Sequence, residues 1–125
     1  MKRDDEKASI AQLSALLEPV AFIRLVEAYG GTRLFVPENG DDKELLVEIG
    51  EDAWKKLADR WGGFHIRVPL AKEYRARHYR AAGLSNAQIA RKLGMTEPGV
   101  NQLFGRMKSV PVKGSGNPMQ LKLFG

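Results

Sequence analysis

The spacing of apolar residues predicts a series of amphipathic helices in the first half of the chain. Apolar side chains recur every three or four positions in three segments, which are residues 8–17, 20–29 and 51–61. Ser9 can cap the first of these segments, and Pro19 separates it from the second. The apolar run 45–49 is too short to distinguish a helix from a strand, and the charged residues 1–7 are expected to fray.

One block of this pattern occurs twice in the chain. At a constant offset of 32 residues, a helix, a Gly-Gly pair, a strand-forming run and a proline follow one another in the same order. The matched positions are Phe22 and Trp54, Leu25 and Leu57, Tyr29 and Trp61, Gly30-Gly31 and Gly62-Gly63, Leu34 and Ile66, and Val36-Pro37 and Val68-Pro69. The strand-forming runs, 32–37 and 64–69, are therefore expected to pair, and each would keep an edge open to a second chain.

Residues 84–107 have the build of a helix-turn-helix. Ser85 and Gln88 have the spacing of a capping box, which predicts a first helix over residues 86–93. Gly94 follows this helix, where the chain must turn sharply with a positive φ that glycine adopts without a steric cost.

The second helix of the motif is expected from Thr96, which can cap it, to about Met107. Pro98 falls in its first turn, where a missing N–H removes no intrahelical bond. Small and apolar residues stand at the spacing that helix-turn-helix motifs use, namely Ala90, Gly94, Val100 and Leu103. The basic segment 70–82 is expected to form a helix that supports the motif.

The polar face of the second helix predicts a reader of duplex DNA. Side-chain amides of Asn and Gln can pair with an adenine edge in the major groove. The expected base contacts are Thr96, Glu97, Asn101 and Gln102. The expected phosphate contacts are Ser85, Asn86, Arg91, Lys92, Arg106 and Lys108. The alternative is an ordinary helical hairpin inside a core, which does not explain why amide and basic side chains gather on this helix.

Charge is unevenly distributed along the chain. Residues 1–69 hold 10 Lys/Arg against 13 Asp/Glu, whereas residues 70–108 hold 8 against 2. The net charge of +5 is therefore concentrated on the segment expected to read DNA, as phosphate binding requires.

Composition argues against several other classes of protein. The chain has no cysteine, which excludes disulfides, and no apolar run as long as a membrane span, so a cytoplasmic protein without a membrane partner is expected. His65 and His78 show no metal-ligand spacing, and the acidic residues at 41–44 lack the pattern of a calcium loop. No Ser-His-Asp set or phosphate-cradling loop is suggested by spacing, so neither an enzyme nor a cofactor is expected.

The segment GGFHIRVP, followed by a basic helix and a helix-turn-helix, resembles the Mor transcription activator family of Mu-like phages over about residues 20–107. The earlier GGTRLFVP resembles the first of two such strands in prophage-type members. The resemblance implies a dimer whose two motifs read a two-fold promoter site, and activation of transcription by contact with RNA polymerase. By position, it implies a linker at Gly62, Gly63, Ile66, Val68 and Pro69, and a reading helix at 96–107. Gly99 and Gly105, inside the expected reading helix, depart from the family's pattern. Each destabilises a helix by about 1 kcal/mol relative to alanine.

The expected fold is mainly α with short β-strands, in three parts. These are an α/β dimerisation region at 1–69 with the two Gly-Gly strands, a helix-turn-helix DNA-binding domain at 70–108 and a flexible tail at 109–125. Trp54 and Trp61 lie on one helix face, which fits either a core or a homodimer interface. The residues expected at that interface are Trp54, Trp61, Phe64, Ile66 and Val68.

The C-terminal tail suggests an alternative function. Residues 113–118, KGSGNP, have the composition of a linker. After them come the residues that resemble the short peptide by which bacterial proteins dock on the DNA polymerase sliding clamp, namely Gln120, Leu121, Leu123 and Phe124. The alternative to a transcription regulator is therefore a DNA-associated accessory protein that docks on the clamp, and a tail that folds back over the protein is a third interpretation.

Overall fold

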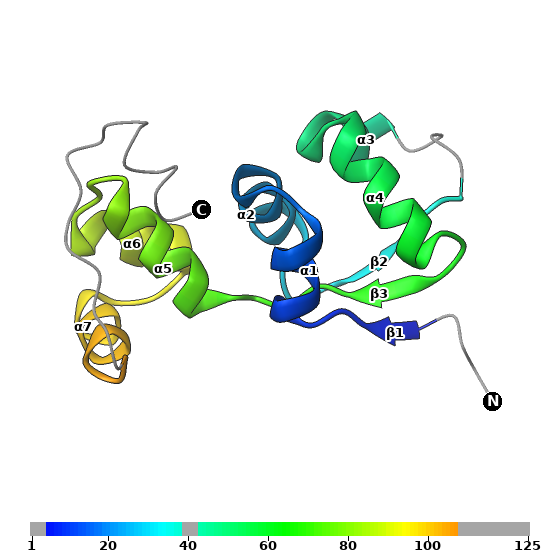
Figure 1. The fold of residues 1–125 in the computed structure, drawn as a ribbon. Coiled ribbons are helices and arrows are strands. Elements are labelled where there is room, and N and C mark those ends of the chain that lie inside the picture. The colour runs from blue at the N-terminus through cyan, green and yellow to red at the C-terminus, as the bar shows by residue number, and fades with distance from the viewer. Residues whose placement is uncertain (1–4, 39–42, 108–125) are drawn as a thin grey trace. The chain divides into compact units, whose positions relative to one another are not determined.

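The computed structural model describes residues 5–38 and 43–107, and the chain divides after Ala71 into two compact units. The part up to Ala71 is called unit 1 here, and the part from Lys72 is called unit 2. Both consist mainly of helices, and unit 1 also contains a small sheet (Figure 1). The expectation of a mainly α fold with short β-strands is therefore confirmed.

Helices form most of unit 1. They are α1 (Ile10–Leu16), α2 (Pro19–Tyr29), α3 (Lys43–Ile49) and α4 (Glu51–Trp61). α1 begins with a capping box, in which Ser9 Oγ accepts the Gln12 N–H at 3.0 Å and Gln12 Oε1 accepts the Ser9 N–H at 3.0 Å. Residues 45–49 are helical rather than extended, because Leu45 and Ile49, one turn apart, are both buried.

Three short strands form one sheet. Its order is β1 (Asp5–Lys7), β3 (His65–Arg67) and β2 (Arg33–Phe35). β2 and β3 are antiparallel with Leu34 opposite Ile66, so the two strand-forming runs do pair with each other. β1 pairs with β3 in parallel, so the expectation that residues 1–7 fray is wrong for residues 5–7. β3 also has a neighbour on each side, so the expectation that it keeps an open edge is wrong.

The two copies of the repeat are built alike. α2 and α4 each end at a glycine, Gly30 or Gly62, whose N–H bonds to the carbonyl oxygen four residues earlier. A Cβ at these positions would lie 2.4 Å and 2.5 Å from that same oxygen. The glycines that follow, Gly31 and Gly63, have φ of +80° and +87°. Each helix therefore needs both glycines to turn into its strand.

The core of unit 1 lies between the helices and the inner face of the sheet (Figure 1). Trp54, Trp61, Ile66 and Val68 all belong to this core, and none of them is more than 7% exposed. Their assignment to a dimer interface is therefore corrected, because they pack within a single chain. α4 buries both tryptophans because they stand two helical turns apart on one face. Of the five residues expected at the interface, only Phe64 is exposed, by 37%.

Helices also form the described part of unit 2. They are α5 (Lys72–Ala81), α6 (Asn86–Leu93) and α7 (Glu97–Gly105). All three lie within the segments expected to be helical, and α6 has the expected bounds. Ala76 and Tyr79 of α5 are buried, as expected for the face that supports the other two helices.

Candidate nucleic-acid interface

A tight turn joins α6 to α7, and local chemistry defines the helix ends around it. Ser85 Oγ accepts the Gln88 N–H at 3.2 Å and Gln88 Oε1 accepts the Ser85 N–H at 2.8 Å, which completes the capping box of α6. Gly94 ends α6 in the left-handed conformation, with φ 66° and ψ 38°. Thr96 Oγ1 accepts the Gly99 N–H at 3.1 Å and caps α7. These three local predictions are confirmed.

An apolar core holds α6 and α7 together and against α5. Its side chains are Ala76, Tyr79, Ile89, Ala90, Leu93, Val100, Leu103 and Phe104, all buried. Burying a side chain of the size of leucine or isoleucine contributes about 1.5 to 3 kcal/mol. Helices as short as α6 and α7 are therefore held by this packing rather than by their own propensity.

Arg75 is buried on α5 and fixes one end of α6. Its Nη2 donates to the Lys92 carbonyl oxygen at 2.9 Å, and its Nε donates to Tyr79 Oη at 3.2 Å. The Lys92 carbonyl lies in the last turn of α6, where backbone oxygens lack intrahelical partners and the helix dipole favours a cation. In the sequence, Arg75 is one of several basic residues in the segment 70–82. The spacing of one helical turn from Tyr79 was the only signal of this role.

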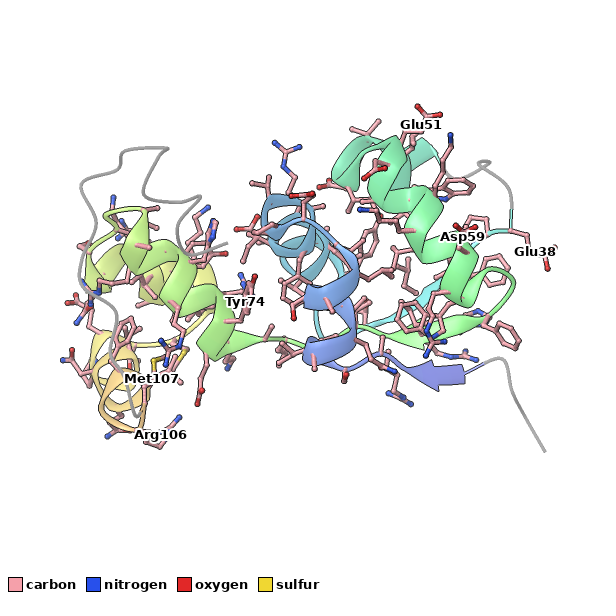
Figure 2. All side chains as sticks on the ribbon, viewed as in Figure 1. Glu38, Glu51, Asp59, Tyr74, Arg106 and Met107 are labelled. Atoms are coloured by element: carbon pink, nitrogen blue, oxygen red, sulfur yellow. The ribbon has the colours of Figure 1, made fainter. Side chains whose placement is uncertain are left out.

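The surface of the helix pair carries most of the residues expected to contact DNA. The exposed members are Arg91 and Lys92 on α6, Thr96 at the start of α7, and Glu97, Asn101 and Gln102 on α7. Arg106, directly after α7, is exposed as well (Figure 2). Lys108 lies outside the described residues.

Burial raises the pKa of the Tyr74 hydroxyl on α5 above its usual value, so this phenol is protonated at neutral pH and adds no negative charge.

Several of the expected contact residues already have partners inside unit 2. The hydroxyls of Ser85 and Thr96 serve as helix caps. Asn86 Oδ1 accepts from the Arg80 guanidinium, and Asn86 Nδ2 donates to Asn101 Oδ1 at 2.5 Å. Arg80 was not among the expected site residues, because no local pattern links positions that are 6 and 15 residues apart.

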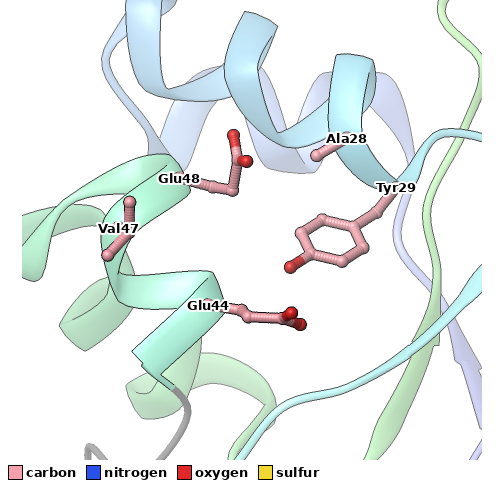
Figure 3. A pocket seen from close by; sticks show the side chains of 5 residues that line it. All are labelled: Ala28, Tyr29, Glu44, Val47 and Glu48. Atoms are coloured by element: carbon pink, nitrogen blue, oxygen red, sulfur yellow. The ribbon is translucent and has the colours of Figure 1, made fainter.

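Unit 1 has a hollow between α2 and α3 (Figure 3). It is lined by Ala28, Tyr29, Glu44, Val47 and Glu48. The two carboxylates would repel a phosphate, so the hollow is unsuited to nucleic acid. Across residues 5–38 and 43–107, no group of three or more His, Cys, Asp or Glu side chains could hold a metal ion.

Comparisons of the chain with protein-family models, with curated proteins and with solved structures gave no match. In the described part of the chain, no helix is long and apolar enough to cross a membrane.

The residues expected to dock on the clamp lie outside the described residues, so that alternative stays a prediction. They are Gln120, Leu121, Leu123 and Phe124. A function is therefore inferred from the surface of α6 and α7.

Proposed function

We propose that this protein binds duplex DNA sequence-specifically and reads it through α7. The observation that carries the proposal is the surface of α6 and α7, where amide side chains that can read base edges are exposed beside basic side chains that can bind phosphates. A helix with its side chains is about 10 to 12 Å wide, and the major groove is about 12 Å wide. α7 therefore has the dimensions of the reading helix in a helix-turn-helix.

The proposal gives the exposed side chains two kinds of role. Asn101 and Gln102 face base edges and supply specificity. Arg91, Lys92 and Arg106 bind phosphates and supply the sequence-independent part of the affinity. The charge balance supports this division, because residues 70–108 hold 8 Lys/Arg and only 2 Asp/Glu.

The packing of unit 2 also supports the proposal, because a reading element must be held firmly in position. Arg75 fixes the end of α6, and the caps at Ser85 and Thr96 fix the two helix starts. Val100 and Leu103 bury the inner face of α7. The outer side chains of α7 are thus presented from a fixed backbone.

We further propose that the protein is a transcription regulator of the Mor type. This extension depends on the resemblance of GGFHIRVP and the following helices to that family. Two copies would then read a two-fold site and activate transcription through RNA polymerase. The second copy would bind a surface other than Trp54, Trp61, Ile66 and Val68, because these side chains are buried within one chain.

Selection of bound duplexes from a random pool defines the site, and alanine variants test the roles. Asn101→Ala or Gln102→Ala should each lose about 1 to 3 kcal/mol of preference at one base position. Lys92→Ala should weaken binding to all sequences alike and reduce the slope of affinity against salt by about one. Lys55→Ala is the matched control, because it removes the same charge from unit 1, where Lys55 forms an exposed ion pair with Glu51 at 3.6 Å. If neither amide variant changed the selected site, α7 would not be the reading helix.

A further inference from the structure

The orientation of the Asn101 amide follows from a chain of hydrogen bonds that begins at Arg80. The Arg80 guanidinium donates to Asn86 Oδ1, and Asn86 Nδ2 donates to Asn101 Oδ1 at 2.5 Å. A guanidinium has N–H donors and no acceptor. Asn86 must therefore turn its oxygen to Arg80 and its nitrogen to Asn101. Asn101 must in turn present its oxygen to Asn86.

Arg80 is itself held in place by the core of unit 2. Its Cζ lies 4.8 Å from the centroid of the Phe104 ring, and Phe104 is a buried residue of α7. Its Nη1 donates to the Leu84 carbonyl oxygen at 3.5 Å. The chain of hydrogen bonds therefore starts from a fixed donor, and the direction of both amides is determined by it.

The consequence concerns what Asn101 can offer to a base. Its Oδ1 is already an acceptor for Asn86, whereas its Nδ2 donates no hydrogen bond within the described part of the chain. Pairing with adenine uses both atoms of the amide, the nitrogen to N7 and the oxygen to the N6 amino group. Guanine instead presents two acceptors, N7 and O6. A carbonyl oxygen can accept a second bond, but this one is directed toward Asn86, so the amide turns its nitrogen donors to a base and fits the guanine edge better.

We infer that Asn101 selects guanine rather than adenine, and that Arg80 and Asn86 determine this preference without contact with the base. The inference deepens the proposed function and rests on it. It also replaces the expectation, drawn from residue type alone, that this asparagine pairs with adenine. Arg80 and Asn86 are positioning residues in this account, because they act through the orientation of Asn101.

The substitution Asn86→Asp should reverse the orientation of Asn101. A carboxylate accepts on both oxygens, so Asp at this position can hold Arg80 with one oxygen and the Asn101 nitrogen with the other. Asn101 would then expose its oxygen, which accepts from the amino groups of adenine or cytosine. The base preference at the position read by Asn101 should change from guanine to adenine or cytosine by roughly tenfold, with the other positions unchanged.

The experiment is selection from a random duplex pool with the wild-type chain, Asn86→Asp and Ala87→Asp, after thermal unfolding has shown that each is folded. Ala87→Asp is the matched control, because it adds the same charge one residue away and outside the chain of hydrogen bonds. It should weaken binding to all sequences alike and keep the preference for guanine at the position read by Asn101. Asn86→Ala serves as a second variant, and it should reduce the preference for guanine over adenine roughly tenfold by freeing the Asn101 oxygen.

The outcomes separate this inference from the proposed function. The position read by Asn101 is the one at which Asn101→Ala loses its base preference. If that base is adenine in the wild-type site, or if Asn86→Asp and Asn86→Ala both keep guanine, the inference is overturned and the proposed function stands. If the wild-type chain selects no site from the pool, the proposed function fails and the inference fails with it.

Discussion

Gly94 and Gly105 belong to the same helix pair, but the backbone requires glycine at only one of them. Gly94 has φ of +66°, and a Cβ there would meet nothing within 4 Å, so alanine would be strained by its conformation alone. Gly105 is the last residue of α7, and a Cβ there would also meet nothing within 4 Å. The two positions therefore differ in backbone conformation and not in steric contacts.

Gly94→Ala should lower the free energy of unfolding by about 1 to 2 kcal/mol, because its left-handed conformation is unfavourable for a residue with a Cβ. Gly105→Ala should raise it by about 0.4 to 1 kcal/mol, because alanine restricts the unfolded chain and suits a helix. Urea unfolding followed by circular dichroism measures both changes. Lower stability of Gly105→Ala would contradict the helical conformation of Gly105. Unchanged stability of Gly94→Ala would contradict the left-handed turn at Gly94.

Residue-scale features were predictable where they depend on near neighbours in sequence. The caps at Ser85 and Thr96 and the turn at Gly94 act on residues no more than four positions away. The bonds from Asn86 to Asn101 and from Arg75 to Lys92 span 15 and 17 residues, and they depend on how the helices pack. The helix ends around the candidate site could therefore be predicted, but the orientation of its amides could not.

At the scale of elements, the length of the apolar pattern decided what could be predicted. α4 has the bounds that its apolar pattern predicted. α3 has 7 residues, of which Leu45 and Ile49 are buried, and its apolar run is too short to distinguish a helix from a strand. β1 consists of the charged residues Asp5–Lys7 and shows no apolar alternation, so it is a strand because β3 offers it a partner.

Arg75 links two of these elements, and its loss should loosen unit 2. Arg75→Met keeps the apolar stem but leaves the Lys92 carbonyl without its charged partner, which should lower the free energy of unfolding by about 1.5 to 3 kcal/mol. Arg77→Met removes the same charge from a half-buried position on α5 and should change stability by no more than about 0.5 kcal/mol. Urea unfolding of the two variants measures both changes in the free energy of unfolding. Equal losses in the two variants would contradict the anchoring role of Arg75.

At the scale of the whole molecule, two features of the sequence reappear in the structure. The 32-residue repeat corresponds to α2 with β2 and α4 with β3, and most of the basic residues of 70–108 that the structure describes lie on α5 and α6. What covers the tryptophans of α4 could not be predicted. An amphipathic stripe shows that a helix face is buried, but it does not show whether the same chain or a second copy covers it. The structure shows that Trp54 and Trp61 are covered within one chain.

The central claim is that α7 enters the major groove of duplex DNA, and methylation interference on the selected duplex tests it most directly. Dimethyl sulfate modifies guanine N7, which lies in the major groove, and adenine N3, which lies in the minor groove. We predict that methylation of guanine N7 within the site weakens binding by at least about tenfold, because it blocks the edge that α7 reads. Interference at adenine N3 alone would place the protein in the minor groove and contradict the claim.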